Sequence, residues 1–197
     1  MAAGITFMDT ILHYLPIIAV LAVFAERMRE VSTKRETVPG KTQEKLTFNL
    51  FMFCGVAIVA GGISEYLLLG LDFWWPTFVI GLPMSIASFV IRRSAIRALG
   101  RFWSLHVEMR EGHEFVKNGP FARARHPVYF SMILELFGIG LMLNAWFTLA
   151  GVFAIFIPTM LTRVRIEERA LVEKFGDAYR TYMKTTPAII PCGCRSK

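Results

Sequence analysis

Two segments in the second half of the sequence hold the residue types that could do chemistry. They are residues 99–129 and 163–182, and both combine His or Tyr with Arg and Glu. If the second segment is a helix, Arg163 and Glu167 share one face about 6 Å apart along the axis, while Glu168 points about 100° away. Arg163 could then hold a carboxylate, and Glu167 a cation or a pair of hydroxyls. The spacing by itself favours a simpler interpretation, an ion pair on a helix surface.

A second candidate is the run Arg125, His126 and Pro127. Proline has no N–H and is favoured in the first position of a helix, so a helix is predicted to begin at Pro127. Arg125 and His126 would lie at its start, where free amide donors and the positive end of the helix dipole attract anions. Tyr129 would follow one turn in. A basic anchor at a membrane surface explains the same residues equally well.

The elements that must position these residues are predicted to be membrane helices. Hydrophobic residues make up 54% of the 197 residues and charged residues only 19%, below the usual quarter. Apolar stretches occur at residues 5–25, 47–71, 73–91 and 128–161. The last is too long for one crossing of a hydrocarbon core about 30 Å thick. Asn144 divides it into two short helices joined by a tight turn, which makes five spans.

The positions of the basic residues predict the orientation. All 22 Lys and Arg residues fall in residues 27–45, 92–125 and 163–197. Cytoplasmic loops are enriched in Lys and Arg. Five spans place these three segments on one side of the membrane, whereas four spans would place the last segment on the opposite side. The sequence therefore predicts an integral membrane protein with its N-terminus outside and with its C-terminus and active site in the cytosol.

The predicted fold is all-α, an integral membrane bundle of five transmembrane helices. Residues 1–91 would form three N-terminal transmembrane helices with a cytosolic linker near residues 26–46. Residues 92–197 would form a catalytic region with a turn-rich loop, the short helical hairpin 128–161 and a cytosolic amphipathic C-terminal helix. Gly176 is predicted to break that last helix.

Several classes of site and partner are not expected. The sequence has three cysteines but no Cys/His zinc spacing, so no metal site is predicted. The net charge of +7 comes from bases that flank apolar runs and do not interleave with aromatic residues, so no nucleic-acid partner is predicted. The turn-rich loop around His113, Val116 and Gly119 follows no predicted strand, which disfavours a Rossmann nucleotide domain. The oligomeric state stays open.

Two acidic residues, Glu65 and Glu135, lie inside predicted spans. Intramembrane acids are costly and often functional. Glu65 is near the outer end of its helix, so we expect a structural role. Glu135 lies at mid-depth and should face either a polar cavity or a hydrogen-bonding neighbour, and substrate contact and a structural role are equally supported.

Motifs between residues 99 and 191 follow one another in a specific order: LG..WS, GH..V..GPF, RHPVY, the turn with Asn144 and Trp146, R...EE, and FG..Y..Y. In this order and spacing, the chain resembles the isoprenylcysteine carboxyl methyltransferase family and its relatives among the phospholipid N-methyltransferases. The resemblance implies an integral membrane enzyme that transfers a methyl group from S-adenosyl-L-methionine to a lipophilic acceptor. The cofactor would occupy a cytosolic pocket between the loop before the hairpin and the C-terminal helices, and the acceptor would enter from the bilayer.

The resemblance also implies roles for single residues. Arg163 would face the polar group of the acceptor, and Glu167 would orient the acceptor or contact the cofactor. The implied cofactor-binding residues are His113, Val116, Gly119, Phe121, Arg125, His126, Tyr129, Glu167 and Glu168. The sequence departs from the family pattern at Phe121, where tyrosine is usual, at Ser131, where glycine is common, and at Ala188, which often is arginine. The change at Ala188 bears on the acceptor, if that arginine binds an acceptor carboxylate.

The predicted function is methylation of a lipophilic acceptor, such as the carboxylate of a prenylcysteine-like compound or a similar small amphiphile. The partners would be that lipid or small molecule and the membrane lipids. Methylation of a phospholipid amine is an alternative. Two non-enzymatic alternatives are a small transporter, whose path Glu65 and Glu135 would mark, and a scaffold. The acceptor and its reacting atom stay open.

Overall fold

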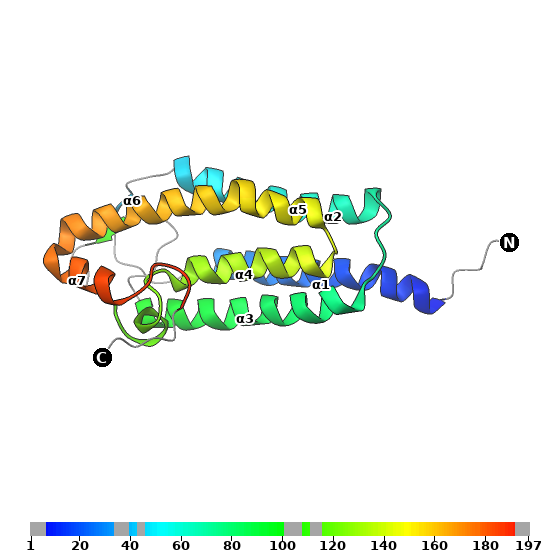
Figure 1. Ribbon diagram of the computed structural model, residues 1–197, viewed down its shortest axis with the longest axis horizontal. Helices are drawn as coiled ribbons and strands as arrows, with labels where there is room; N and C mark the ends of the chain where they lie inside the picture. The colour runs from blue at the N-terminus through cyan, green and yellow to red at the C-terminus, as the bar shows by residue number, and fades with distance from the viewer. Residues whose placement is uncertain (1–6, 34–39, 43–45, 101–107, 111–115, 192–197) are drawn as a thin grey trace.

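The structure is a computed structural model in which residues 7–33, 40–42, 46–100, 108–110 and 116–191 are described. The described helices are α1 (Phe7–Ser32), α2 (Leu46–Leu68), α3 (Trp75–Leu99), the 3-10 helix η2 (Gly119–Ala122), α4 (Pro127–Met142), α5 (Trp146–Gly151), the π-helix η3 (Val152–Phe156), α6 (Ile157–Phe175) and α7 (Asp177–Thr185). Figure 1 shows the long helices lying side by side, with α7 at the end of the bundle farthest from the N-terminus.

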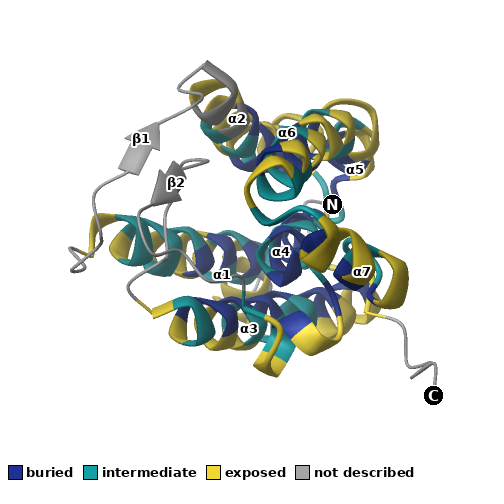
Figure 2. Cartoon of the chain, turned by 90° about the vertical axis from the view of Figure 1, so that its left-hand side faces the viewer, coloured by how far each residue is buried: buried dark blue, intermediate teal, exposed yellow. Residues whose placement is uncertain are grey.

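The helices form two groups around α4. Viewed along the bundle, α1, α3 and α4 lie together, and α2, α5 and α6 lie together on the other side of α4 (Figure 2). The most extensive contact between described elements is between α3 and α4. Two glycines allow it, because a Cβ on Gly81 would lie 2.5 Å from the carbonyl oxygen of Gly138, and a Cβ on Gly138 would lie 2.6 Å from that of Gly81. The pair α3–α4 therefore needs glycine at both positions.

Three described helical stretches are long and apolar enough to cross a membrane. They are Thr10–Ser32, Trp75–Leu99 and Trp146–Phe175, and two shorter apolar helices are Met52–Leu68 and Pro127–Met142. Large apolar side chains are exposed along them, including Ile18, Phe53 and Phe147. Such surfaces suit contact with lipid, so an integral membrane protein is supported. The count of five spans and the sides of the membrane stay predictions.

The expectation of an all-α chain was incomplete, since the described part contains a two-stranded antiparallel sheet. β1 (Gly40–Thr42) pairs with β2 (Glu108–Arg110), with Gly40 opposite Arg110. The sheet joins the connection after α1 to the connection after α3. Three-residue strands are too short to show an alternating pattern in the sequence, so their pairing depends on the helices that bring the two connections together.

Three predicted helix boundaries are confirmed. α4 begins at Pro127, and α6 ends before Gly176, whose φ is 56°. Between α4 and α5, Asn144 has φ 53°, its N–H donates to Leu141 O at 3.1 Å, and Ala145 N–H donates to Gly140 O at 2.9 Å. These two bonds form a Schellman turn, in which asparagine tolerates the left-handed conformation.

Other predicted boundaries were wrong. The helix after Asn144 does not end near residue 161 but continues to Phe175, so the polar segment from Arg163 extends the same helix. Pro158 has no N–H and cannot make the usual backbone hydrogen bond of a helix. The π-helical turn η3 just before it accommodates the missing bond, so the helix continues without interruption. α1 likewise continues to Ser32, beyond the predicted start of a linker at residue 26. The predicted boundary at residues 91/92 falls inside α3.

Candidate functional site

The candidate site lies where α4 begins, beside α6 and the segment that follows α7. His126 immediately precedes α4, and its own side chain makes no capping hydrogen bond to that helix. The N–H of Arg125 donates to Pro187 O at 2.9 Å, and the N–H of His126 donates to Ala188 O at 2.8 Å. The chain after α7 therefore returns to the start of α4 and is tied to it through the backbone.

Arg125 connects three parts of the site. Its Nε and Nη2 lie 2.8 Å and 2.7 Å from Oε1 of Glu168, and its Nη1 donates to the carbonyl oxygens of Met183, at 3.0 Å, and of Thr186. The Arg125 side chain is 9% exposed. Charge-assisted bonds of this kind are stronger than neutral ones, so Arg125 holds the end of α7 against α6.

His126 lies between the two neighbouring carboxylates of α6. Its Nε2 is 3.1 Å from Oε1 of Glu168, and its Nδ1 is 3.7 Å from Oε2 of Glu167. Glu168 is 15% exposed and shares one oxygen with Arg125 and His126, whereas Glu167 is 33% exposed. Glu167 is therefore the more accessible carboxylate, and Glu168 is mainly occupied by protein partners.

A second contact places Arg163 in the same site. Its Nε donates to the hydroxyl of Tyr129 at 3.3 Å, and both residues are buried. Glu167 interacts with the same hydroxyl. Arg163, Tyr129, Glu167, His126 and Glu168 thus form one continuous polar chain from α6 across the start of α4. The structure brings together the R...EE and RHPVY motifs, which are far apart in the sequence.

Two tyrosines on α7 complete the wall of the site, although they were not among the predicted site residues. Tyr182 O–H donates to Phe121 O at 2.5 Å, and the rings of Tyr179 and Tyr182 pack edge to face. Burial raises the pKa of Tyr182 to about 12, against the opposing charge of Arg125. Burial, and then the charges of Glu168 and Glu167, raise the pKa of Tyr179 well above its usual value. In the sequence, the feature that could have pointed to these two tyrosines is their three-residue spacing on the apolar face of the predicted helix.

The remaining predicted cofactor residues lie before α4. Gly119 has φ 58° at the start of η2, Phe121 is buried in η2, and Val116 is partly buried. His113 lies outside the described residues. Ser131 is buried on α4, and its hydroxyl donates to Val128 O at 2.6 Å. The Ser131 hydroxyl therefore has its hydrogen-bond acceptor within α4.

The donor set fits the polar part of S-adenosyl-L-methionine, which carries a carboxylate, an ammonium and ribose hydroxyls. The start of α4 places the positive end of a helix dipole where a carboxylate could lie, and the part-exposed Glu167 offers an acceptor for the ammonium or for hydroxyls. A metal has no such place, because no group of three or more His, Cys, Asp or Glu among the described residues could hold an ion.

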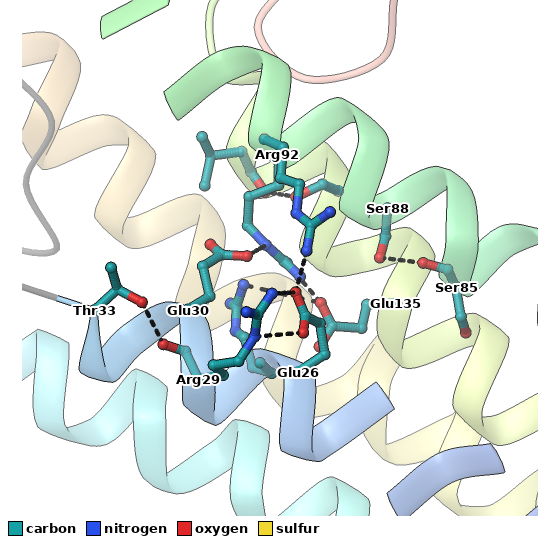
Figure 3. A network of polar contacts seen from close by, with 12 residues as sticks. Glu26, Arg29, Glu30, Thr33, Ser85, Ser88, Arg92 and Glu135 are labelled. Atoms are coloured by element: carbon teal, nitrogen blue, oxygen red, sulfur yellow. Dashed lines mark hydrogen bonds and ion pairs between the residues drawn. The ribbon is translucent and has the colours of Figure 1, made fainter. Parts of the chain in front are cut away.

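The two intramembrane acids have defined partners. Glu65 accepts hydrogen bonds from Phe147 N–H at 3.0 Å, from Thr148 N–H at 2.7 Å and from the Thr148 hydroxyl at 2.8 Å. It caps the start of α5 from the neighbouring helix α2, which is the structural role expected. Glu135 faces a hydrogen-bonding neighbour, since Arg92 Nη1 donates to its Oε2 at 2.5 Å (Figure 3).

Comparisons with known proteins agree with the resemblance. The sequence profile of the isoprenylcysteine carboxyl methyltransferase (ICMT) family matches residues 79–173. The chain is 35% identical over 102 residues to the uncharacterized protein YpbQ of Bacillus subtilis, covering 51% of this chain and 58% of YpbQ. It is 30% identical over 138 residues to the cobalt-zinc-cadmium resistance protein CzcN of Cupriavidus metallidurans, covering 68% of this chain and 61% of CzcN.

A plant enzyme is also similar. The protein-S-isoprenylcysteine O-methyltransferase B of Arabidopsis thaliana is 28% identical over 120 residues, covering 60% of each chain. The chain thus spans about three fifths of the length of these relatives. The matched region runs from α3 to α6 and contains Arg125, His126, Tyr129, Arg163, Glu167 and Glu168. Residues 79–173 of this chain are thus similar to the isoprenylcysteine carboxyl methyltransferase family.

Proposed function

We propose that this protein is a membrane methyltransferase that uses S-adenosyl-L-methionine and methylates the carboxylate of a prenylcysteine-like amphiphile. One observation carries the proposal: Arg163, Tyr129, Glu167 and His126 meet at the start of α4, within the region that matches the family. The name of the plant relative supplies the acceptor class.

The proposed role of each site residue follows from the exposure and the charge of its side chain. When bound, the cofactor supplies an electrophilic methyl group, so the protein mainly has to align the reactants and exclude water. Arg163 is buried and directed by the Tyr129 hydroxyl, so it would hold the acceptor carboxylate in one orientation. The more accessible Glu167 and the amides at the start of α4 would bind the cofactor. Arg125 and Glu168 would position His126 and the segment after α7.

A carboxylate acceptor needs no general base, because it is already ionised near neutral pH. An amine acceptor would need one, and Glu167 or His126 would serve. Ala188 contributes only a methyl group at a position where arginine is common in the family, so Arg163 would be the main contact of the acceptor carboxylate.

The experiment uses the full chain reconstituted in phosphatidylcholine nanodiscs with methyl-labelled S-adenosyl-L-methionine. N-acetyl-S-farnesylcysteine is compared with the same compound as its carboxamide and with phosphatidylethanolamine. We expect base-labile methyl ester only from the free acid. Labelled phosphatidylethanolamine would reject the proposed acceptor in favour of amine methylation, and no cofactor binding in equilibrium dialysis would reject the enzyme and favour a transporter or scaffold.

Matched variants test the residue roles. Arg163→Gln should abolish ester formation, whereas Arg165→Gln, an exposed position on the same helix, should not change it. Glu167→Gln should weaken cofactor binding, whereas the exposed Glu173→Gln should leave it unchanged. Equal effects within either pair would contradict the assignment.

The proposed orientation has the N-terminus outside and the C-terminus with the site in the cytosol, with five spans and a catalytic region after the third. A fluorescent protein fused after Lys197 should fold and fluoresce, while alkaline phosphatase at the same point should be inactive. The reverse result would overturn this orientation.

A further inference from the structure

The C-terminal part of the chain lies over buried residues of the candidate site. His126 is 4% exposed, Tyr129 9% and Arg163 3%. α7 turns back from the end of α6 toward the start of α4 (Figure 1), and the segment after α7 reaches His126, whose N–H donates to Ala188 O at 2.8 Å. A water-soluble molecule as large as the proposed cofactor can reach these three buried side chains only if part of the protein moves.

Gly176 connects α6 to α7 in a conformation that suits a hinge. Its φ is 56° and its ψ is −130°, a combination that residues with a side chain rarely adopt. A Cβ placed on Gly176 would meet nothing within 4 Å, so the backbone angles require glycine here and crowding does not. The outer surface of α7 is polar, with Asp177, Arg180 and Lys184 exposed. The connection between α6 and α7 is therefore open to water on its outer side.

Arg125 fastens the far end of α7. Its Nη1 donates to the carbonyl oxygens of Met183, at 3.0 Å, and of Thr186, and its N–H donates to Pro187 O at 2.9 Å. A single residue before α4 thus binds three successive parts of the returning chain. A rotation of α7 about its connection to α6 would break these bonds together, so the returning chain is either fastened or released as one unit.

The inner face of α7 lies close to the two carboxylates of α6. Tyr179 is 2% exposed, and burial, followed by the charges of Glu168 and Glu167, raises the pKa of its hydroxyl. Rotation of α7 away from α6 would admit water to this tyrosine and to both carboxylates. Its return would exclude water again, which strengthens electrostatic contacts inside a site and protects reactive groups from hydrolysis.

We infer that residues 177–191 form a lid over the start of α4, with Gly176 as its hinge and Arg125 as its latch, and that this lid opens to admit the cofactor and closes over it. The hinge and the latch follow from the geometry of the chain, whereas the identity of the admitted molecule rests on the proposed function. Closure of such a segment shields a reaction from water and retains the bound reactants. Arg125 is a positioning residue, because it acts on the cofactor through the lid.

Hydrogen exchange of the full chain in phosphatidylcholine nanodiscs tests the lid directly, because lid carbonyl oxygens protect the amides of Arg125 and His126. Without cofactor, we expect these two amides to exchange together with residues 177–191 and faster than the interior of α4. Arg125→Lys keeps the charge but loses the forked guanidinium, so it should speed this exchange about tenfold. The exposed Arg123→Lys should leave the exchange unchanged. Bound S-adenosylhomocysteine should slow it about tenfold.

Gly176→Ala is a second variant, which stays informative if Arg125→Lys fails to fold. Alanine is strained at this φ and favours continuation of α6, so the lid should open more often and labelled S-adenosyl-L-methionine should dissociate about tenfold faster. Gly70→Ala is the matched control, since Gly70 has φ 58° and a Cβ there would also meet nothing within 4 Å. It should change neither rate.

Unchanged exchange of residues 177–191 in both variants would overturn the inference. So would equal exchange with and without S-adenosylhomocysteine that equilibrium dialysis shows to be bound, or exchange of the lid only together with the interior of α4. If dialysis detects no cofactor while the two variants open the lid as expected, the proposed function fails and the hinged lid stands.

Discussion

Arg125 and Glu168 meet through two nitrogens on one carboxylate oxygen, at 2.8 Å and 2.7 Å, although 43 positions separate them in the sequence. The same oxygen also lies 3.1 Å from His126 Nε2. This contact fixes the start of α4 against α6, and α7 follows through the carbonyl groups that Arg125 also binds.

Glu168→Gln should lower the free energy of unfolding by about 2 kcal/mol, because it removes the charge from partly buried hydrogen bonds. Thermal unfolding in detergent would measure the change. The exposed Glu173→Gln serves as the control and should be within about 0.5 kcal/mol of the parent chain. Equal stability of the two variants would contradict the role given to Glu168.

Tyr129→Phe should reduce methyl transfer about tenfold to a hundredfold, because the Tyr129 hydroxyl accepts from Arg163 and misplacement of a positioning group has effects of this size. In a double-mutant cycle with Arg163→Gln, the second change should have little further effect. Fully additive losses in kcat/KM would show that the two residues act separately.

Glu65→Ala should cost about 1 to 2 kcal/mol of stability, as does the loss of a helix cap, because two amides and a hydroxyl at the start of α5 lose their acceptor. Cofactor binding per folded molecule should not change. Loss of binding with unchanged stability would place Glu65 in the functional machinery instead.

Gly138→Ala should destabilise the chain by about 1 to 3 kcal/mol, because its Cβ would press against the Gly81 carbonyl on α3. Gly151→Ala is the matched control, since nothing lies within 4 Å of a Cβ at that helical position. It should be neutral or slightly stabilising. The comparison is made by unfolding in the same detergent.

The stability contributed by the Tyr182 hydroxyl should disappear only in strong alkali. The pKa of Tyr182 is raised to about 12 in the folded chain, against about 10 when unfolded, so the neutral form is favoured by folding. The contribution is complete below pH of about 10 and is lost as pH rises through about 12. The difference in phenolate absorbance between the parent chain and Tyr182→Phe, recorded during an alkaline titration, should therefore appear near pH 12. A difference that appears near pH of about 10 would contradict this prediction.

The sequence by itself determined the features that depend on local backbone chemistry. Pro127 starts α4 because it lacks an N–H, Asn144 turns the chain because it tolerates positive φ, and Gly176 ends α6 for the same reason. The ordered motifs from residue 99 onward also identified the family, since they preserve both residue type and spacing. The helical membrane class followed from apolar stretches alone.

Only the tertiary structure decided which of these residues meet. The partner of Glu135 comes from α3, the acceptor that caps α5 comes from α2, and Arg125 reaches Glu168 on α6. None of these pairs has a characteristic spacing along the chain. The sheet between β1 and β2 and the continuation of the helix past Pro158 likewise depend on packing. Local preferences set where helices begin and end, but long-range contacts are set by how whole helices pack, and a single sequence carries no direct record of that.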